Sequence, residues 1–258
     1  MKILLIDTCG ATGSIALAGA APAPAAASLP GRSAAERLVP AIHSLAVRSR
    51  VPLHSLDAIA VVHGPGSFTG VRVGLSAAKG LCHALNLPLV AISRLAVLAS
   101  LAQFESPEQR VPHSSQQVGD EWVHPVRALL DAGRGEFYSG LYANGLCLRE
   151  SLLTRDQLFA EQCREEAQLI VCEPAVAESL GAPSKLGLGG NATPQFVAEP
   201  TAASALPLAL ARIQQRAFDD PASIDANYLR RTDAEIFAKP IAAAAPQPRP
   251  SHPGSPSR

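Results

Sequence analysis

The sequence predicts an α/β protein of two lobes, in which helices flank mixed sheets. Short apolar, β-branched runs alternate with helical patterns over the first hundred residues, and a polar stretch at 105–122 separates them from a second such set. A chain of 258 residues is long enough for two lobes. We therefore expect an N-terminal lobe at 1–104, a second lobe with a C-terminal helix at 105–238, and a disordered tail rich in Ala, Pro and Ser at 239–258.

The composition excludes several classes of function. With 22 basic and 22 acidic residues the net charge is zero, so binding of nucleic acid by charge alone is not expected. The five cysteines form no CxxC pair, which is typical of reduced thiols. No two of the seven histidines are three or four residues apart, so we predict no helical metal site. No apolar run is long enough for a signal peptide or a membrane span, and we expect a cytoplasmic protein.

The chain begins with two predicted strands, 2–6 and 13–18, joined in a hairpin. The first strand ends in Asp7 and Thr8, and Gly10 lies in the turn. This arrangement resembles the start of actin-like and sugar-kinase-like ATPases, whose turn amides face phosphates and whose carboxylate faces hydrated Mg²⁺. Asp7, Thr8 and Gly10 are therefore candidate nucleotide-facing residues. An aspartate that caps its own turn gives the same pattern, and from the residues alone we favour this second interpretation.

A glycine-rich turn, Gly64–Gly70, joins a buried strand at 57–63 to a helix at 71–85. Its three glycines and one proline fix an abrupt change of direction, and a hydroxyl side chain in the turn can cap the helix. The turn does not end in Gly-Lys-Ser/Thr, and the first lysine after it is Lys79, so a Walker phosphate loop is excluded. The spacing of the glycines does not fit a dinucleotide fingerprint either. The turn is thus expected to orient the helix.

The helix after this turn carries small residues every fourth position, at Gly70, Gly74, Ala78 and Cys82. A glycine inside a helix costs about 1 kcal/mol relative to alanine, so the pattern requires a packing reason. A nearly flat face suits a second helix at a short distance between axes. The second helix can belong to this chain or to a partner, and the spacing leaves both open.

The remaining expected elements complete the two lobes. We expect helices at 33–50, 93–103, 154–167 and 206–218, strands at 88–92, 126–130, 136–142, 168–172 and 186–191, and an edge strand or loop at 20–31. A tight turn at 131–135 joins two of these strands in a hairpin. Its charged side chains, Asp131, Arg134 and Glu136, are expected to form solvated ion pairs rather than an acid/base group.

Four stretches resemble the bacterial TsaB (YeaZ) family in the same order. The segment 60–74 is similar to the hallmark of that family, and Ile6–Thr8, Asp131–Tyr138 and Tyr228–Arg230 also match. The resemblance covers about residues 1–232. It implies an actin-like (ASKHA) fold of two related lobes and a non-catalytic paralogue of the catalytic subunit TsaD.

The resemblance also implies partners. Members of the family pair with TsaD and with the ATPase TsaE, and the assembly adds a threonylcarbamoyl group to adenosine 37 of tRNAs that read codons beginning with A. ATP is used by the complex, whereas this chain is expected to need no cofactor. Alone, the chain is expected to form a homodimer, and to meet tRNA only through the complex.

By the same resemblance, the helix after the glycine-rich turn forms the partner interface. The residues that take this role here are Gly70, Val71, Gly74, Leu75, Ala78 and Cys82. Two rival classes are an active ASKHA kinase or ATPase and a metallopeptidase. The absence of a histidine pair in 33–50 argues against the peptidase, and we identify neither a complete phosphate loop nor a catalytic aspartate for a kinase.

Overall fold

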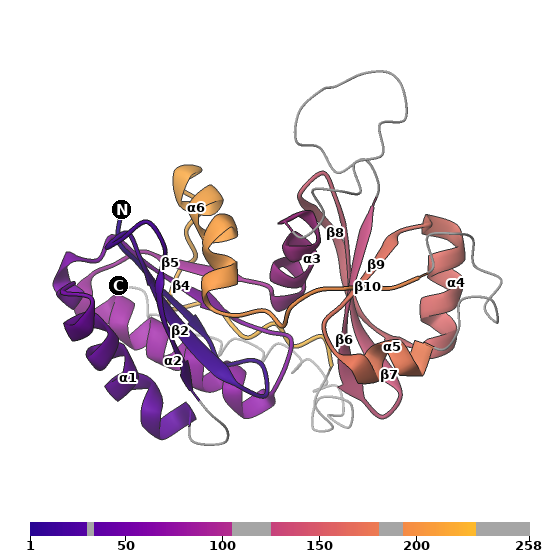
Figure 1. Cartoon of the computed structure of the whole chain (residues 1–258), viewed down its shortest axis with the longest axis horizontal. Helices are drawn as coiled ribbons and strands as arrows, with labels where there is room; N and C mark the ends of the chain where they lie inside the picture. The colour runs from indigo at the N-terminus through magenta and orange to yellow at the C-terminus, as the bar shows by residue number, and fades with distance from the viewer. Residues whose placement is uncertain (30–33, 105–124, 181–192, 231–258) are drawn as a thin grey trace, which may run out of the picture.

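A computed structural model describes residues 1–29, 34–104, 125–180 and 193–230, and it contains two five-stranded sheets side by side (Figure 1). The first sheet has the order β3-β2-β1-β4-β5, and the second has the order β10-β9-β6-β7-β8. The strands of the first are β1 (Ile3–Asp7), β2 (Gly13–Ala18), β3 (Ala25–Leu29), β4 (Ala58–Val62) and β5 (Leu89–Ile92). Those of the second are β6 (Val126–Gly133), β7 (Glu136–Ala143), β8 (Leu146–Thr154), β9 (Gln168–Val171) and β10 (Gln195–Phe196).

The two sheets share one topology. In each, the first strand pairs antiparallel with the second and parallel with the fourth: β1 with β2 and β4, and β6 with β7 and β9. The third strand extends each sheet on the antiparallel side, and the fifth extends it on the parallel side. This repeat confirms the predicted α/β, actin-like fold of two related lobes, each with a mixed sheet.

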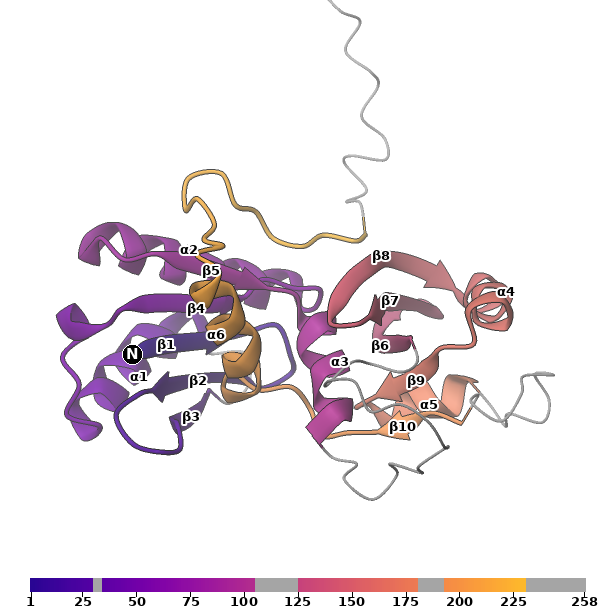
Figure 2. The same ribbon diagram turned by 90° about the horizontal axis from the view of Figure 1, so that it is seen from above.

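Helices cover both faces of the first sheet. On one face α1 (Ala34–Arg48) and α2 (Phe68–Leu85) pack through apolar side chains onto Leu4, Ile6 and the strands beside them. Because side chains alternate along a strand, Ile3 and Leu5 point to the other face. There they meet a short 3-10 helix, Ala203–Ala205, and α6 (Leu206–Gln214). In Figure 2, α6 lies in front of β1 and β2, on the side of the sheet that faces the viewer.

The second sheet is covered in the same way. On one face α3 (Arg94–Phe104) packs against β6 and β7, and on the other α4 (Arg155–Glu165) and α5 (Pro174–Leu180) pack against Leu129 and Phe137. Arg127 of β6 is fully buried and reaches α4, where it forms ion pairs with Glu161 and Glu165. These pairs tie α4 to the centre of the sheet.

The structure corrects the expected placing of two helices. The C-terminal helix was expected in the second lobe, yet α6 packs on the first sheet, where Ala209 is fully buried. Conversely, α3 follows the first sheet in sequence but lies mainly on the second. α6 buries an apolar face on the first sheet, whereas α3 is apolar on all sides and contributes Val97 to the core of the first lobe and Leu95 and Leu98 to that of the second, which sequence order alone does not reveal. The two lobes are thus joined by helices that cross between them.

The predicted hairpins form, and turn residues explain their geometry. Arg134 and Gly135, between β6 and β7, both have positive φ, as a two-residue hairpin turn requires. Asn144 and Gly145 repeat this arrangement between β7 and β8. The strand β8 was not predicted, although an Asn-Gly pair is a strong hairpin signal. Helix α5 and the short β10 were missed as well.

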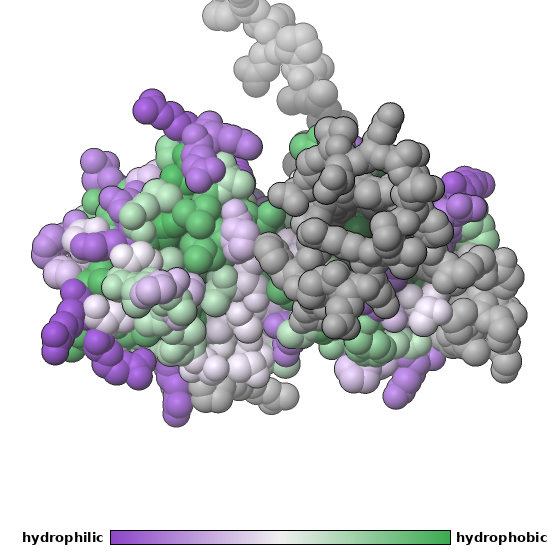
Figure 3. Space-filling view, turned by 45° about the horizontal axis from the view of Figure 1, so that its top comes forward, coloured by the Kyte–Doolittle hydropathy of each residue, from purple (hydrophilic) through white to green (hydrophobic). Residues whose placement is uncertain are grey.

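Some expectations lie outside the described residues, namely the boundary at 105–122, the strand at 186–191 and the tail at 239–258. Among the residues that the structure covers, no helix has the length and apolar character needed to cross a membrane. Figure 3 shows hydrophobic residues gathered on the first lobe, on the side that carries α6. The α6 side chains there are only partly buried: Leu206, Leu208, Leu210 and Ile213.

Candidate functional site

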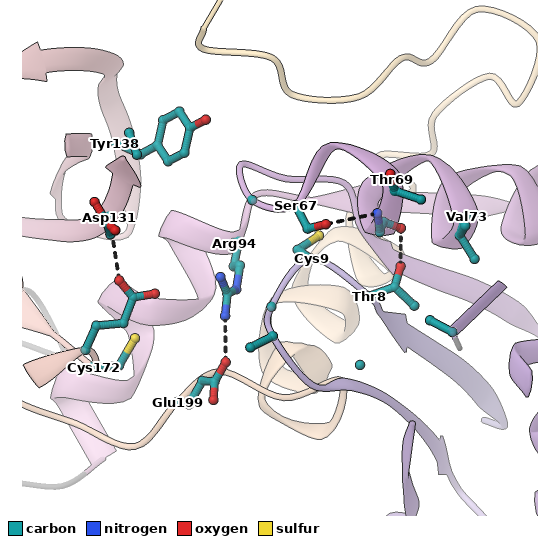
Figure 4. A pocket seen from close by; sticks show the side chains of 18 of the residues that line it. Thr8, Cys9, Ser67, Thr69, Val73, Arg94, Asp131, Tyr138, Cys172 and Glu199 are labelled. Atoms are coloured by element: carbon teal, nitrogen blue, oxygen red, sulfur yellow. Dashed lines mark hydrogen bonds and ion pairs between the residues drawn. The ribbon is translucent and has the colours of Figure 1, made fainter. Parts of the chain in front are cut away.

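A large pocket lies between the lobes, with a volume of about 1130 Å³ (Figure 4). The first lobe supplies the β1–β2 turn and the start of α2, and the second supplies the β6–β7 turn, Tyr138 and the end of β9. Where the structure describes the lining, its charged side chains are Arg94, Asp131, Glu173 and Glu199. The β1–β2 turn, which holds the candidate nucleotide-facing residues, forms one wall of this pocket.

Asp7 lies at the end of β1 and is only 3 % exposed. Its Oδ1 accepts a hydrogen bond from the amide of Cys9, at 2.8 Å. Burial raises the pKa of the Asp7 carboxyl, and the positive charge of Arg94 and the Cys9 amide counter this only in part. The carboxyl therefore caps its own turn, as the plainer interpretation of the sequence predicts.

Thr8 and Gly10 do line the pocket. The Thr8 hydroxyl donates a hydrogen bond to the carbonyl of Gly70, at 2.6 Å, and so fastens the β1–β2 turn to the first turn of α2. Gly10 lies beneath the side chain of Arg94: a Cβ there would be 2.6 Å from Nη2 of Arg94 and 2.8 Å from Oε1 of Glu199. A larger residue at this position would have to displace the Arg94 guanidinium and the Glu199 carboxylate.

Arg94 and Glu199 form an ion pair across the floor of the pocket, with Nη2 and Oε1 3.0 Å apart. The Arg94 side chain is 5 % exposed and that of Glu199 is 49 % exposed. Within the described residues, Nε of Arg94 has no hydrogen-bond partner. Neither residue was predicted from the sequence. The only available signal for Arg94 was its position after the apolar run 88–92, and Glu199 had no signal.

Three amides at or beside the pocket donate to the chain's own carboxylates. Besides the bond from Cys9 to Asp7, the amide of Asp131 donates to Glu173 at 2.9 Å, and the amide of Gly133 donates to Asp131 at 2.8 Å. In a phosphate site such amides face the ligand. Among the described lining residues, Asp131, Glu173 and Glu199 also outnumber Arg94, so this part of the lining carries more negative than positive charge.

The two cysteines at the pocket are not poised as nucleophiles. Burial raises the pKa of the Cys172 thiol to about 11, and it raises that of the Cys9 thiol well above its usual range. Cys9 Sγ also lies 3.1 Å from the carbonyl of Val62, as a hydrogen-bond donor. Both thiols therefore stay protonated near neutral pH. Among the described residues, no group of three or more His, Cys, Asp or Glu side chains could hold a metal ion.

The structure corrects the expected partner interface. The apolar members of that set, Val71, Leu75, Ala78 and Cys82, are at most 5 % exposed. They pack into the core of the first lobe, so their side chains cannot reach a partner. The small-residue face of α2 is therefore turned into the first lobe, where α2 packs on β4 and β1 and contacts α1.

Gly70 and Gly74, the two glycines of that set, are also explained by packing within the first lobe. A Cβ at Gly70 would overlap the main-chain oxygen of Thr8, and one at Gly74 would overlap its hydroxyl. The glycines thus let α2 lie directly on the end of β1. Ser67 caps the helix by accepting from the Gly70 amide, at 3.3 Å.

The opposite faces of α1 and α2 are exposed. On α1, Val39 and Val47 are 59 % and 63 % exposed and lie two turns apart on one side, with His43 between them. On α2, Ser76 and Gly80 are exposed one turn apart. Both helices cover the same face of the first sheet. We call these exposed sides of the two helices the α1/α2 face; it includes Val39, Val47, Ser76 and Gly80.

Comparison with known proteins identifies the relatives of this chain. The family described as "TsaD: tRNA N6-adenosine threonylcarbamoyltransferase" matches residues 24–245. The chain is similar to the tRNA threonylcarbamoyladenosine biosynthesis protein TsaB of Escherichia coli, with 32% identity over 55% of each chain. It is also similar to the TsaB protein of Bacillus subtilis, with 37% identity over 43% of this chain and 42% of that one. The match thus spans about half the length of these curated relatives.

A solved structure supports the same relationship. The chain is similar to an uncharacterized protein with similarity to peptidase YEAZ from Pseudomonas aeruginosa, with a TM-score of 0.67 and 26% identity. The similarity covers 89% of this chain and 99% of that one. It therefore extends over both lobes.

Proposed function

Since the chain belongs to the TsaB (YeaZ) branch of the TsaD family, we propose that it is a non-catalytic subunit in tRNA threonylcarbamoyladenosine biosynthesis. In this role it pairs with the catalytic subunit TsaD and works with the ATPase TsaE. The assembly adds the threonylcarbamoyl group to adenosine 37 of tRNAs that read codons beginning with A.

The hydrogen bonds and charges of the pocket between the lobes support the proposal that this chain is not catalytic. Three amides at or beside the pocket, those of Cys9, Asp131 and Gly133, donate to Asp7, Glu173 and Asp131. To bind a polyphosphate, these bonds would have to be replaced in a pocket with an excess of negative charge. ATP is therefore used by the complex and not held in this cleft, and the chain itself needs no cofactor.

The α1/α2 face supports the proposed pairing with TsaD. Exposed apolar side chains such as Val39 and Val47 are more favourable in an interface, where they leave water. Small residues such as Ser76 and Gly80 permit a helix of the partner to approach closely. When TsaD is absent, the same face pairs with a second copy of this chain. The chain meets tRNA only through the complex, because its net charge is zero.

The test is an omission experiment. A tRNA transcript and the L-threonylcarbamoyl-adenylate donor are incubated with TsaD, TsaE, ATP and this chain, and each protein is left out in turn. We expect threonylcarbamoylation to be lost without this chain, and none to occur with this chain as the only protein. Full modification in its absence contradicts the proposal.

The same set of reactions tests the rival, an ASKHA ATPase or kinase with activity of its own. Release of phosphate from ATP is followed with this chain alone and with the full set of proteins. The proposal expects phosphate release only when TsaE and TsaD are present. Sustained release by the chain alone would favour the rival.

A further inference from the structure

The segment from Asp219 to Arg230 crosses from the first lobe back to the second, after α6 (Figure 2). We propose that this segment is a latch: it holds the two lobes in one relative orientation, and it links the position of α2 to the far wall of the inter-lobe pocket. The proposal rests on the contacts of the segment and is independent of the proposed function.

The first end of the latch is fixed to the edge of the first sheet. Asp219 pairs with Leu89 of β5 in an isolated antiparallel bridge, and its amide donates to the Leu89 carbonyl at 2.9 Å. Its carboxylate accepts from the amide of Ala91, at 2.7 Å, and forms an ion pair with Arg212 of α6. The segment therefore starts from a point that is rigid relative to the first sheet.

The middle of the latch is bonded to α2 and to the end of β4. Lys79 of α2 donates to the carbonyl of Ile224, at 2.8 Å. The amide of Asn227 donates to the carbonyl of His63, at 2.8 Å. Arg72 donates through Nε to the hydroxyl of Tyr228, at 2.6 Å, and its guanidinium stacks on Phe68. Any movement of α2 is thus transmitted to the segment.

The last residues of the latch are bonded to the second lobe. The side-chain amide of Asn227 donates to Glu150 of β8, at 2.6 Å. Arg230 donates to the carbonyl of Ala132, at 2.8 Å, and forms an ion pair with Glu136, at 2.5 Å. Asn227 therefore bonds to both lobes at once, through its main chain to the first and through its side chain to the second.

These bonds hold the part of the second lobe that faces the pocket. Arg230 contacts the end of β6, and Asp131 and Ala132 at this end line the pocket. Leu229 packs against the core between α3 and the second sheet. The acidic wall of the pocket is thus joined through Arg230 and Tyr228 to the first turn of α2. Breaking the bonds to the second lobe should leave each lobe folded but let the angle between the lobes vary.

The test measures the distance between the lobes in the full chain. Spin labels are attached at Arg48→Cys of α1 and Asp156→Cys of α4, both exposed, in a background where the exposed Cys147 and Cys163 are changed to serine. We expect a single narrow distance distribution for this parent. The variant Asn227→Ala/Arg230→Ala is expected to give a distribution that is broader and extends to other distances.

The matched control is Arg149→Ala. Arg149 also forms partly exposed ion pairs with glutamates, but both partners lie within the second lobe. This variant should keep the narrow distribution. Circular dichroism establishes that each variant is folded. A distribution unchanged by Asn227→Ala/Arg230→Ala, or one that Arg149→Ala broadens equally, overturns the latch.

A charge exchange provides a second measurement if the double alanine variant does not fold. Arg230→Glu places two carboxylates together and is expected to broaden the distribution. Adding Glu136→Arg restores an ion pair between positions 230 and 136 and should narrow it again. A general loss of stability would not be reversed in this way. If the distance distribution of Arg230→Glu/Glu136→Arg is as broad as that of Arg230→Glu alone, the result counts against the latch.

Discussion

Gly70 and Gly80 lie on the same helix but have different surroundings. A Cβ at Gly70 would overlap the main-chain oxygen of Thr8, which cannot rotate away, whereas no atom lies within 4 Å of a Cβ at Gly80. We predict that Gly70→Ala lowers the free energy of unfolding by about 1–3 kcal/mol, through overpacking. Gly80→Ala should raise it by up to about 1 kcal/mol, because alanine favours the helix.

Thermal unfolding of the two variants decides this prediction. A shift of 1 kcal/mol changes the melting temperature by roughly 2–4 °C in a chain of this size. If both alanine variants melt at or above the temperature of the parent, the close packing of α2 on β1 is not needed for stability. The small residues on this face of α2 would then have a role other than stabilising the fold.

Asp7 gives the stability of the protein a component that depends on pH. Its folded pKa is raised above the ordinary value of 3.8 by burial. The folded state therefore holds this proton more tightly than the unfolded state, and the component is present at low pH and lost as the pH rises through the folded pKa. Asp7→Asn has no such proton, and it can still accept from the Cys9 amide.

The prediction compares the two proteins by denaturant unfolding at a series of pH values. The stability of Asp7→Asn relative to the parent should increase as the pH rises from 3.8 through the folded pKa of Asp7, and then stay constant. A difference that decreases over this range would mean that Arg94 stabilises the Asp7 carboxylate more than burial disfavours it.

At the scale of elements, the α1/α2 face and the edge strand β8 expose apolar side chains to nearly the same extent. Val39 of α1 is 59 % exposed, and Leu148 of β8 is 58 % exposed. We predict that Val39→Glu weakens the association with TsaD at least tenfold, about 1.4 kcal/mol, because the interface would bury an unpaired charge. Leu148→Glu, in the other lobe, should leave the affinity unchanged.

Calorimetric titration with TsaD gives the two affinities, and the melting temperature of each variant shows whether the fold is intact. Since both side chains are exposed, neither change should destabilise the chain by more than about 0.5 kcal/mol. Equal affinities for Val39→Glu and the parent would remove α1 from the pairing face.

The elements with a clear local signal were predictable from sequence. The hairpin of β1 and β2, the strand β4 and the helix α2 follow from periodicity and turn residues. The spacing of Gly70 and Gly74 also predicted that another part of the structure packs closely on this face. It could not predict which part, because a strand end and a second helix both require a small residue at the contact. Only the structure shows that Thr8 fills this place.

At the scale of the whole molecule, the repeat of one topology in two sheets brings two equivalent turns, β1–β2 and β6–β7, to the same pocket. Arg94 and Glu199 reach its floor from segments 105 residues apart. No sequence pattern links such positions, and therefore the pocket could be expected from the fold but its ion pair could not. The crossing of α3 and α6 between the lobes escaped prediction for the same reason.

The charge of this pocket leads to a prediction for the intact chain. A ligand that binds only the folded state at a hundred times its Kd stabilises that state by about 2.7 kcal/mol, so binding is visible as a rise in melting temperature. Because Asp7, Asp131 and Glu173 already accept from the turn amides, we expect ATP with Mg²⁺ to leave the melting temperature of this chain unchanged. TsaE, measured in the same way, serves as the positive control. A rise that saturates with ATP concentration would mean that the carboxylates give up these amides to phosphate, and that the cleft is a nucleotide site after all.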